Sequence, residues 1–121
     1  MKEIIAIIRP KKVRATKEAL EAIGFPSFMA MQVLGRGHQR GIAAEVACEI
    51  PPEVQGRSGG MKYIPKRLLS IVVPDADEAQ VVNTIIKANQ TAQIGDGKIF
   101  VCPVEEAMRV RTDERGDQAI L

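Results

Sequence analysis

The chain has few aromatic residues and few cysteines. It contains no Trp, one Tyr and three Phe in 121 residues, so its core has to be built from Ile, Val, Leu, Ala and Met. Its two cysteines, Cys48 and Cys102, form no CxxC pair, and there is only one histidine. This composition argues against a disulfide or zinc framework, and we expect a loop thiol and a strand packing residue instead.

Long apolar runs and an excess of one charge are also missing. No apolar run approaches the roughly 20 residues of a membrane span, and the opening MKEIIAIIRP lacks the long apolar centre of a signal peptide. The chain has 17 Lys and Arg and 15 Asp and Glu, which gives a net charge of +2. A charge this small does not indicate a protein that binds nucleic acid or a membrane surface. We therefore expect one cytoplasmic domain over residues 1–121, in which any anion site is formed locally.

One pattern of strand, helix and strand is present twice. Gly24 supplies a stop for the first helix, and Asp75 with Glu78 has the spacing of a capping box for the second. The predicted strands are residues 4–8, 28–34, 68–73 and 98–104, and the predicted helices are residues 12–23 and a segment starting at residue 75. Two such units predict an α+β fold, the ferredoxin-like double split βαβ sandwich. The helices would cover one sheet face, and copies of the chain would bury the other.

A long insertion separates the two halves. Residues 42–62 contain two prolines and three glycines without sustained periodicity. Loops beyond roughly 12–15 residues are uncommon in compact domains and tend to be functional or disordered. We interpret this segment as a functional loop, with an inert insertion as the alternative.

Four segments have the composition of an anion site. Glycine-rich turns let backbone N–H groups converge on phosphate oxygens, and Lys and Arg add charge-assisted hydrogen bonds. Turn glycines beside solvated bases are the alternative for each segment taken alone. The segments are Gly35–Gly41 (GRGHQRG), Lys66, Ile94–Lys98 (IGDGK) and Arg109–Arg111 (RVR).

No catalytic machinery accompanies these segments. His38 has no nucleophile or carboxylate cluster beside it in the sequence, so we assign it no metal or proton-transfer role. We expect the protein not to be an enzyme. A ferredoxin-like nucleotide-dependent enzyme that uses the same phosphate loops stays as the alternative.

The combination of motifs resembles the PII family of nitrogen-regulatory signal-transduction proteins. The resemblance spans nearly the whole chain, and the order and spacing of IGDGKIFV and RVRT are its most specific part. It rests on MKEIIAIIRP at the start, GRGHQRG at 35–41, IPK at 64–66, IVVPD at 71–75, IGDGKIFV at 94–101 and RVRT at 109–112.

The resemblance implies a homotrimeric nitrogen-status sensor that binds ATP or ADP, Mg and 2-oxoglutarate as effectors between neighbouring subunits. It implies a T-loop at about 37–62, a nucleotide loop at 91–98 and a C-terminal loop at 109–115. Gln39 would complete the Mg coordination, Lys66 would pair with 2-oxoglutarate, and Arg109 and Arg111 would reach the phosphates of the adjoining subunit. The ligand-binding residues that it implies are Gly35, Gly37, His38, Gln39, Arg40, Gly41, Lys66, Ile94, Gly95, Asp96, Gly97, Lys98, Arg109 and Arg111.

The sequence departs from the common family pattern at two places. The expected Thr-Gly-Lys before IGDGK is Thr91-Ala92-Gln93, which puts some nucleotide contacts in question. The loop is longer than usual and has no Tyr over residues 43–60, so covalent modification by uridylylation is not expected.

The longer loop resembles the nitrogenase-associated (nif-linked) PII-like branch of methanogenic archaea and anaerobic bacteria. That resemblance implies direct, allosteric regulation of dinitrogenase together with a shorter-loop paralogue. The alternative partner is an ammonium transporter or another enzyme of nitrogen metabolism. Neither nucleic-acid binding nor membrane insertion is expected.

Overall fold

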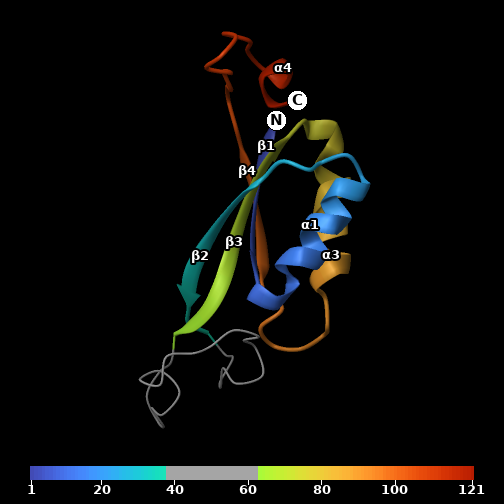
Figure 1. Cartoon of the computed structure of the whole chain (residues 1–121), viewed down its shortest axis with the longest axis vertical. Coiled ribbons are helices and arrows are strands. Elements are labelled where there is room, and N and C mark those ends of the chain that lie inside the picture. Colours follow the sequence, from blue (N-terminus) through green and yellow to red (C-terminus); the bar gives the residue numbers. More distant parts are fainter. Residues whose placement is uncertain (38–62) are drawn as a thin grey trace.

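The computed structural model describes residues 1–37 and 63–121. Within these ranges the chain forms one four-stranded sheet and two main helices, with one short helix near the C-terminal end (Figure 1). The elements are β1 (Lys2–Ile8), a 3-10 turn (Pro10–Lys12), α1 (Val13–Ala22), β2 (Met29–Gly35), β3 (Ile64–Val73), a second 3-10 turn (Asp75–Asp77), α3 (Glu78–Asn89), β4 (Lys98–Pro103) and α4 (Asp117–Ile120).

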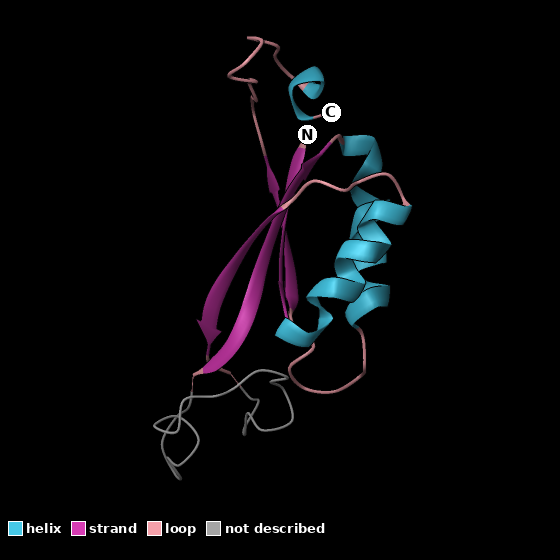
Figure 2. Ribbon diagram, in the orientation of Figure 1, coloured by secondary structure: helices cyan, strands magenta, loops and turns pink. Residues whose placement is uncertain are grey.

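The sheet has the strand order β2-β3-β1-β4, and every neighbouring pair is antiparallel. Helices α1 and α3 lie side by side on one face of this sheet (Figure 2). This arrangement confirms the ferredoxin-like α+β fold expected from the repeated pattern. Of the helices in the described residues, none combines the length and apolar character that a membrane crossing would need.

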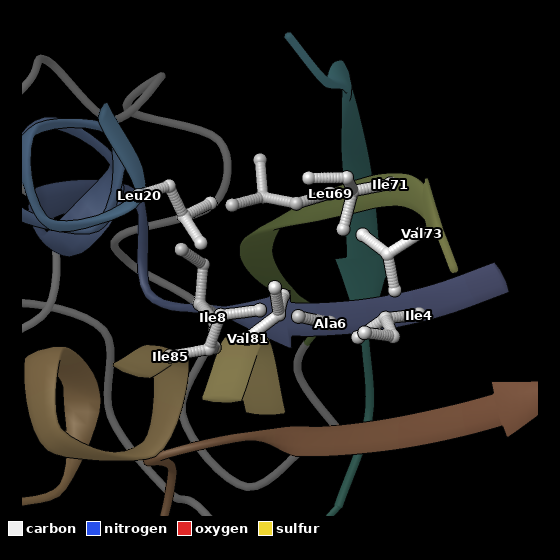
Figure 3. Close-up of a cluster of buried hydrophobic side chains, with 9 residues drawn as sticks. All are labelled: Ile4, Ala6, Ile8, Leu20, Leu69, Ile71, Val73, Val81 and Ile85. Atoms are coloured by element: carbon white, nitrogen blue, oxygen red, sulfur yellow. The ribbon is translucent and has the colours of Figure 1, made fainter. Parts of the chain in front are cut away.

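The core lies between the sheet and the two helices. Ile4, Ala6 and Ile8 point to the same side of β1 because side chains alternate along a strand, and all three are buried. A fully buried Ile side chain contributes about 1.5–3 kcal/mol, and the smaller Ala side chain contributes less. The nine side chains of the cluster, drawn in Figure 3, are Ile4, Ala6, Ile8, Leu20, Leu69, Ile71, Val73, Val81 and Ile85.

A buried polar contact fixes the end of α3 against α1. Asn89 Nδ2 donates to Thr16 Oγ1 and to the Ile85 carbonyl, each at 2.9 Å. Thr16 Oγ1 donates in turn to the Lys12 carbonyl at 2.8 Å. Because Asn89 is the last residue of α3, this contact also fixes the point from which the loop before β4 starts.

The predicted capping box at the start of the second helix is wrong. Residues 75–77 form a 3-10 turn, and α3 begins only at Glu78, with Asp77 as its N-cap and no side-chain cap bond. Asp75 instead pairs with the Met1 ammonium at 3.0 Å. The carboxylate thus has a charged partner outside the helix, which a local pattern does not reveal.

Other element bounds differ from the predictions by small steps, except for β3. This strand begins at Ile64, four residues before the predicted start, because residues 64–67 continue the ladder with β2. Gly24 ends the first helix as predicted: its φ is +92°, and its N–H donates to the Glu21 carbonyl at 3.0 Å.

The sheet face opposite the helices carries two cross-strand rows of mainly apolar side chains. Opposed residues of antiparallel strands share a face. The rows are Met29–Ser70–Ile5–Phe100 and Met31–Leu68–Ile7–Lys98. Met29, Met31 and Phe100 are exposed within the described chain, at 68%, 60% and 49%.

Candidate functional site

Three of the four predicted anion-site segments meet at one end of the sheet. There β1 and β2 end, at Ile8 and Gly35, while β3 and β4 begin, at Ile64 and Lys98. Antiparallel pairing places these ends together, and the loop between α3 and β4 closes the same end (Figure 1). Gly35 lies directly beside Lys66, since a Cβ on Gly35 would lie 3.4 Å from Lys66 Cγ.

Arg9 anchors the loop that precedes β4, a role that no local sequence pattern predicted. Its side chain is buried immediately after β1, with the whole residue 4% exposed. Nη1 donates to Asp96 Oδ1 at 2.6 Å and to Thr91 Oγ1 at 3.2 Å, and Nη2 donates to the Ile94 carbonyl at 2.9 Å. One guanidinium thereby ties both ends of the loop to the end of β1.

Asp96 organises the same loop from within. Its Oδ2 accepts from the amides of Thr91 and Ala92 at 2.7 and 3.0 Å, and its Oδ1 accepts from Thr91 Oγ1. Partial burial alone would raise the pKa of Asp96. Hydrogen bonds from the Thr91 side chain and backbone, with the charge of Arg9, outweigh burial and lower that pKa from 3.8 to about 2. The carboxylate is therefore ionised at neutral pH and supports the loop structure.

Lys66 joins the base of the long insertion to this loop. The residue is 8% exposed, and its Nζ donates to the Gly95 carbonyl at 2.7 Å. It lies on β3, two residues after the strand begins at Ile64. The Lys66 ammonium therefore connects the predicted nucleotide loop to β3, the strand that follows residues 38–62 in the chain.

Gly95 and Gly97 are both required by the backbone. Their φ angles are +104° and +110°, which side-chain-bearing residues rarely adopt. At Gly97 there is also no room, because a Cβ would lie 1.8 Å from the Ile7 carbonyl oxygen. The chain packs against β1 here, so this glycine has a structural reason that is independent of any ligand.

The fourth segment lies at the other end of the sheet. Lys98 pairs with Ile7 at the start of β4 and Pro103 pairs with Lys2 at its end, so the strand carries the chain away from the loop. The segment that follows Pro103 and contains Arg109 and Arg111 lies at the end of the sheet where the N-terminus lies (Figure 1). One chain therefore does not bring all four predicted segments together.

The remaining predicted residues fall into two groups. Gly37 and Lys98 are exposed at the site end, and Ile94 is exposed in the loop. His38, Gln39, Arg40 and Gly41 lie outside the described residues, as does most of the predicted T-loop. Within the described ranges there is no group of three or more His, Cys, Asp or Glu side chains that could hold a metal ion.

A family model decides the relationship of this chain. The model described as "Nitrogen regulatory protein P-II" matches residues 1–114. The chain belongs to the P-II family.

Several P-II relatives match the chain over essentially its whole length. The "Nitrogen fixation nifHD region GlnB-like protein 2" of Methanobacterium ivanovii is 57% identical over 122 residues, covering 100% of each chain. The "Nitrogen fixation nifHD1 region GlnB-like protein 2" of Methanosarcina barkeri is 55% identical, covering 99% of each chain. These relatives confirm the predicted nif-linked branch of the P-II family.

A solved P-II structure has the same fold. The crystal structure of Arabidopsis thaliana PII bound to citrate superposes with a TM-score of 0.75 at 34% identity. It covers 98% of this chain, and this chain covers 90% of it. This similarity supports the ferredoxin-like architecture described above.

The departure at Ala92 from the expected P-II pattern has a measurable consequence. Ala92 has φ +65°, a left-handed conformation that suits the glycine expected at this place. A left-handed backbone conformation costs a non-glycine residue about 1–2 kcal/mol of stability. Replacing it by glycine removes this strain, but the more flexible unfolded chain lowers stability by about 0.4–1 kcal/mol. We expect Ala92→Gly to stabilise the protein by about 0.5–1 kcal/mol, measured by urea unfolding. Ala119→Gly, in α4, is expected to be neutral or destabilising, and equal effects would contradict the strain at position 92.

Proposed function

We propose that this P-II protein is a nitrogen-status sensor that binds ATP or ADP with Mg and 2-oxoglutarate. It would act as a homotrimer and regulate dinitrogenase by direct contact through residues 37–62. Its ligand-binding residues would be those assigned by the family resemblance, including Gln39 as the protein ligand of Mg.

The position of Lys66 is the observation that carries this proposal. Its buried ammonium is bonded to Gly95 O and lies where β3 leaves the long insertion. A dicarboxylate that bound this ammonium would compete with the Gly95 carbonyl for it. Its binding would therefore affect the nucleotide loop and the base of the insertion at the same time. That geometry suits a signal passed from an effector to a partner-binding loop.

The nucleotide site would lie between neighbouring copies of the chain. Strand β4 runs from Lys98 to Pro103, and the segment after it, which contains Arg109 and Arg111, lies at the end of the sheet away from the loop before β4 (Figure 1). A second copy would therefore supply these arginines. The two apolar rows on the open sheet face, with exposed Met29 and Met31, offer the surface on which copies would associate.

The described residues suit a polyphosphate better than a bare metal ion. Lys98 is exposed at the start of β4, beside a loop whose backbone turns at Gly95, and the two arginines would add positive charge from the segment after β4. Magnesium, when bound with the nucleotide, would neutralise phosphate charge and orient oxygen ligands. This chain's own contribution is to place amides and cations around that group.

Allosteric control follows from linkage. If dinitrogenase prefers the 2-oxoglutarate-free conformation of the loop, 2-oxoglutarate has to weaken the binding of dinitrogenase. Dinitrogenase then has to weaken the binding of 2-oxoglutarate by the same factor. Equal 2-oxoglutarate affinity with and without the partner would contradict this account.

The names of the relatives favour dinitrogenase and a paired paralogue over other partners. Methanothermobacter marburgensis has both a "GlnB-like protein 2" that is 56% identical to this chain and a "GlnB-like protein 1" that is 45% identical, each named for a nifHD region. We propose that this chain is the longer-loop member of such a pair. Co-purification with membrane fractions instead of dinitrogenase would favour an ammonium-transporter partner.

Calorimetry of 2-oxoglutarate binding tests the proposal. We expect the wild type to bind 2-oxoglutarate only with Mg-ATP, and Lys66→Met to lose at least about tenfold in affinity, because a charge-assisted contact to the carboxylate is removed. Lys87→Met, on the exposed side of α3, serves as the matched control and should bind as the wild type does. Absence of binding under all conditions would overturn the proposal. Sustained ATP turnover, abolished by Lys98→Ala, would favour the enzyme alternative.

A further inference from the structure

Helix α3 ends without a glycine, and the chain passes straight from its last turn into the loop before β4, residues 90–97. Its C-cap Gln90 has the extended angles φ −67° and ψ 123°, and the Gln90 amide donates to the Ile86 carbonyl at 2.8 Å. Many helices end instead in a left-handed residue, usually glycine, that turns the chain by its own backbone conformation. Gly24 does this after α1. The direction in which the loop leaves α3 therefore needs another support.

The side chain of Asn89, the last residue of α3, provides a support of this kind. The residue is 5% exposed, and its partner Thr16 on α1 is fully buried. Asn89 Nδ2 donates to Thr16 Oγ1 and to the Ile85 carbonyl, and Thr16 Oγ1 donates to the carbonyl of Lys12, the N-cap of α1. Both Nδ2 protons are used, so the orientation of the amide is fixed. Hydrogen bonds thus connect the end of α3 with the start of α1.

The packing of the two helices does not explain why this pair is polar. Asn89 Oδ1 is buried and has no hydrogen-bond partner among the residues that the structure describes. A buried polar atom without a partner lowers stability, whereas two apolar side chains of matching shape lower it little or not at all. The other buried side chains of these helices, Leu20, Val81 and Ile85, are apolar. The amide therefore has a cost in stability that an apolar pair would avoid.

We infer that Asn89 is a positioning residue for the loop before β4, and that Thr16 holds Asn89 in place. Hydrogen bonds are directional, so they fix the end of α3 and the exit of the loop where apolar contacts would allow several arrangements. Thr91, whose amide is bonded within the loop, follows Asn89 by only two residues. The inference rests on the proposed function where it concerns the ligand: a loop with a looser exit would present Lys98 less well to a nucleotide.

Hydrogen exchange on the nucleotide-free protein tests the positioning role. Thr16→Val keeps the shape of the side chain but leaves Asn89 Nδ2 without its acceptor on α1. We expect the amides of Thr91 and Ala92, which are bonded to a side chain within the loop, to exchange at least about fivefold faster. The amide of Gly116, bonded in the C-terminal turn, should keep its wild-type rate.

Two further variants are the controls. Thr16→Ser keeps the hydroxyl and should exchange as the wild type does. Thr84→Val removes a bond of the same kind, because Thr84 Oγ1 donates to the Gln80 carbonyl at 2.7 Å on the same helix, but this bond is exposed. It should leave loop exchange unchanged. Wild-type loop exchange in Thr16→Val, or equally fast exchange in Thr84→Val, would overturn the positioning role.

A double variant separates loop position from stability. Thr16→Val combined with Asn89→Leu removes both polar groups, so no buried donor or acceptor of the pair is left unsatisfied. We expect its urea midpoint to lie above that of Thr16→Val alone, while its loop amides still exchange at least about fivefold faster than in the wild type. Recovery of loop exchange together with the midpoint would show that packing alone positions the loop, and would overturn the role of the hydrogen bonds.

Nucleotide affinity of the same variants tests the consequence for the ligand. Thr16→Val and the double variant should raise the Kd for Mg-ATP by about threefold or more, because binding then has to order a looser loop. Thr16→Ser and Thr84→Val should stay within about twofold of wild type. Faster loop exchange with an unchanged Kd would overturn the role of Asn89 toward the ligand. Wild-type protein that binds no nucleotide would remove the proposed function, while the exchange results would still decide whether Asn89 positions the loop.

Discussion

An alanine at position 97 is expected to destabilise the protein by about 3–5 kcal/mol, the sum of backbone strain and overpacking. Gly97 has φ +110°, and its missing Cβ would overlap the Ile7 carbonyl oxygen at 1.8 Å. That oxygen belongs to the backbone of a central strand, so it has no way to move aside. Urea unfolding of Gly97→Ala at neutral pH measures the loss.

Two other glycines supply the controls for that experiment. Gly24 also has a positive φ, +92°, but no atom lies within 4 Å of its Cβ position, so Gly24→Ala should cost only about 1 kcal/mol. Gly37 also has an open Cβ position and does not have a positive φ, so Gly37→Ala should stay within about 0.5 kcal/mol of wild type. Similar losses for all three variants would contradict the close approach to Ile7.

The requirement for Gly97 affects how ligand experiments are designed. A variant at this position that fails to bind nucleotide would report a distorted loop, not a lost phosphate contact. Lys98, exposed at the start of β4, is the better place to test the phosphate site by substitution. Because Gly97 is required by the packing of the backbone, a glycine motif alone does not identify a ligand contact.

The sheet and its core were predictable from local patterns. Alternation of Ile4, Ala6 and Ile8 follows from the two-residue repeat of a strand, and Leu69, Ile71 and Val73 repeat it on the neighbouring strand. These strand features depend on residues close in sequence, and the helical spacing likewise predicted the burial of Leu20 on α1. On α3 the spacing predicted a main apolar face of Ala79, Val82 and Ile86, but the structure buries Val81 and Ile85 instead and leaves Ile86 40% exposed.

The role of Arg9 could not be predicted in the same way. In the sequence Arg9 directly follows an apolar strand, where a charged residue is common and usually exposed to solvent. Its partners Thr91, Ile94 and Asp96 are 82–87 positions away, and only the pairing of β1 with β4 brings them together. The false capping box has the same origin, because the partner of Asp75 is the ammonium of Met1.

The candidate site was predicted in part. Lys66 and the segment 94–98 come together at one end of the sheet, as expected from their assignment to one anion site. The placement of Arg109 and Arg111 at the opposite end depends on the direction of β4. Binding of ATP, Mg and 2-oxoglutarate by the assigned residues stays a prediction.

Loss of the Arg9 charge is the second substitution from which we expect a large effect. Arg9→Met keeps an apolar stem but leaves Asp96, whose side chain is 22% exposed, without its cation, and removes the bond to Ile94 O. Removing one partner of a largely buried ion pair typically costs about 3–5 kcal/mol, and the exposure of Asp96 lowers our expectation to about 2–4 kcal/mol. Arg14→Met is the matched control: its pair with Glu18 is 90% and 62% exposed, so we expect a loss below about 0.5 kcal/mol.

The pH dependence of this loss separates the ion pair from simple packing. The folded pKa of Asp96, about 2, lies below its ordinary 3.8, so its ionised form stabilises the fold fully above about pH 4. That stabilisation disappears as the pH falls through about 2. Without Arg9 the folded pKa lies closer to 3.8, so the variant loses less on acidification and the difference from wild type should shrink between about pH 4 and 2. Asp75, whose pKa is lowered by its bond to the Met1 ammonium, titrates in both proteins and cancels in the difference. A difference that stayed constant down to pH 2 would assign the effect of Arg9 to its packing and its bond to Ile94 O, and not to the charge of Asp96.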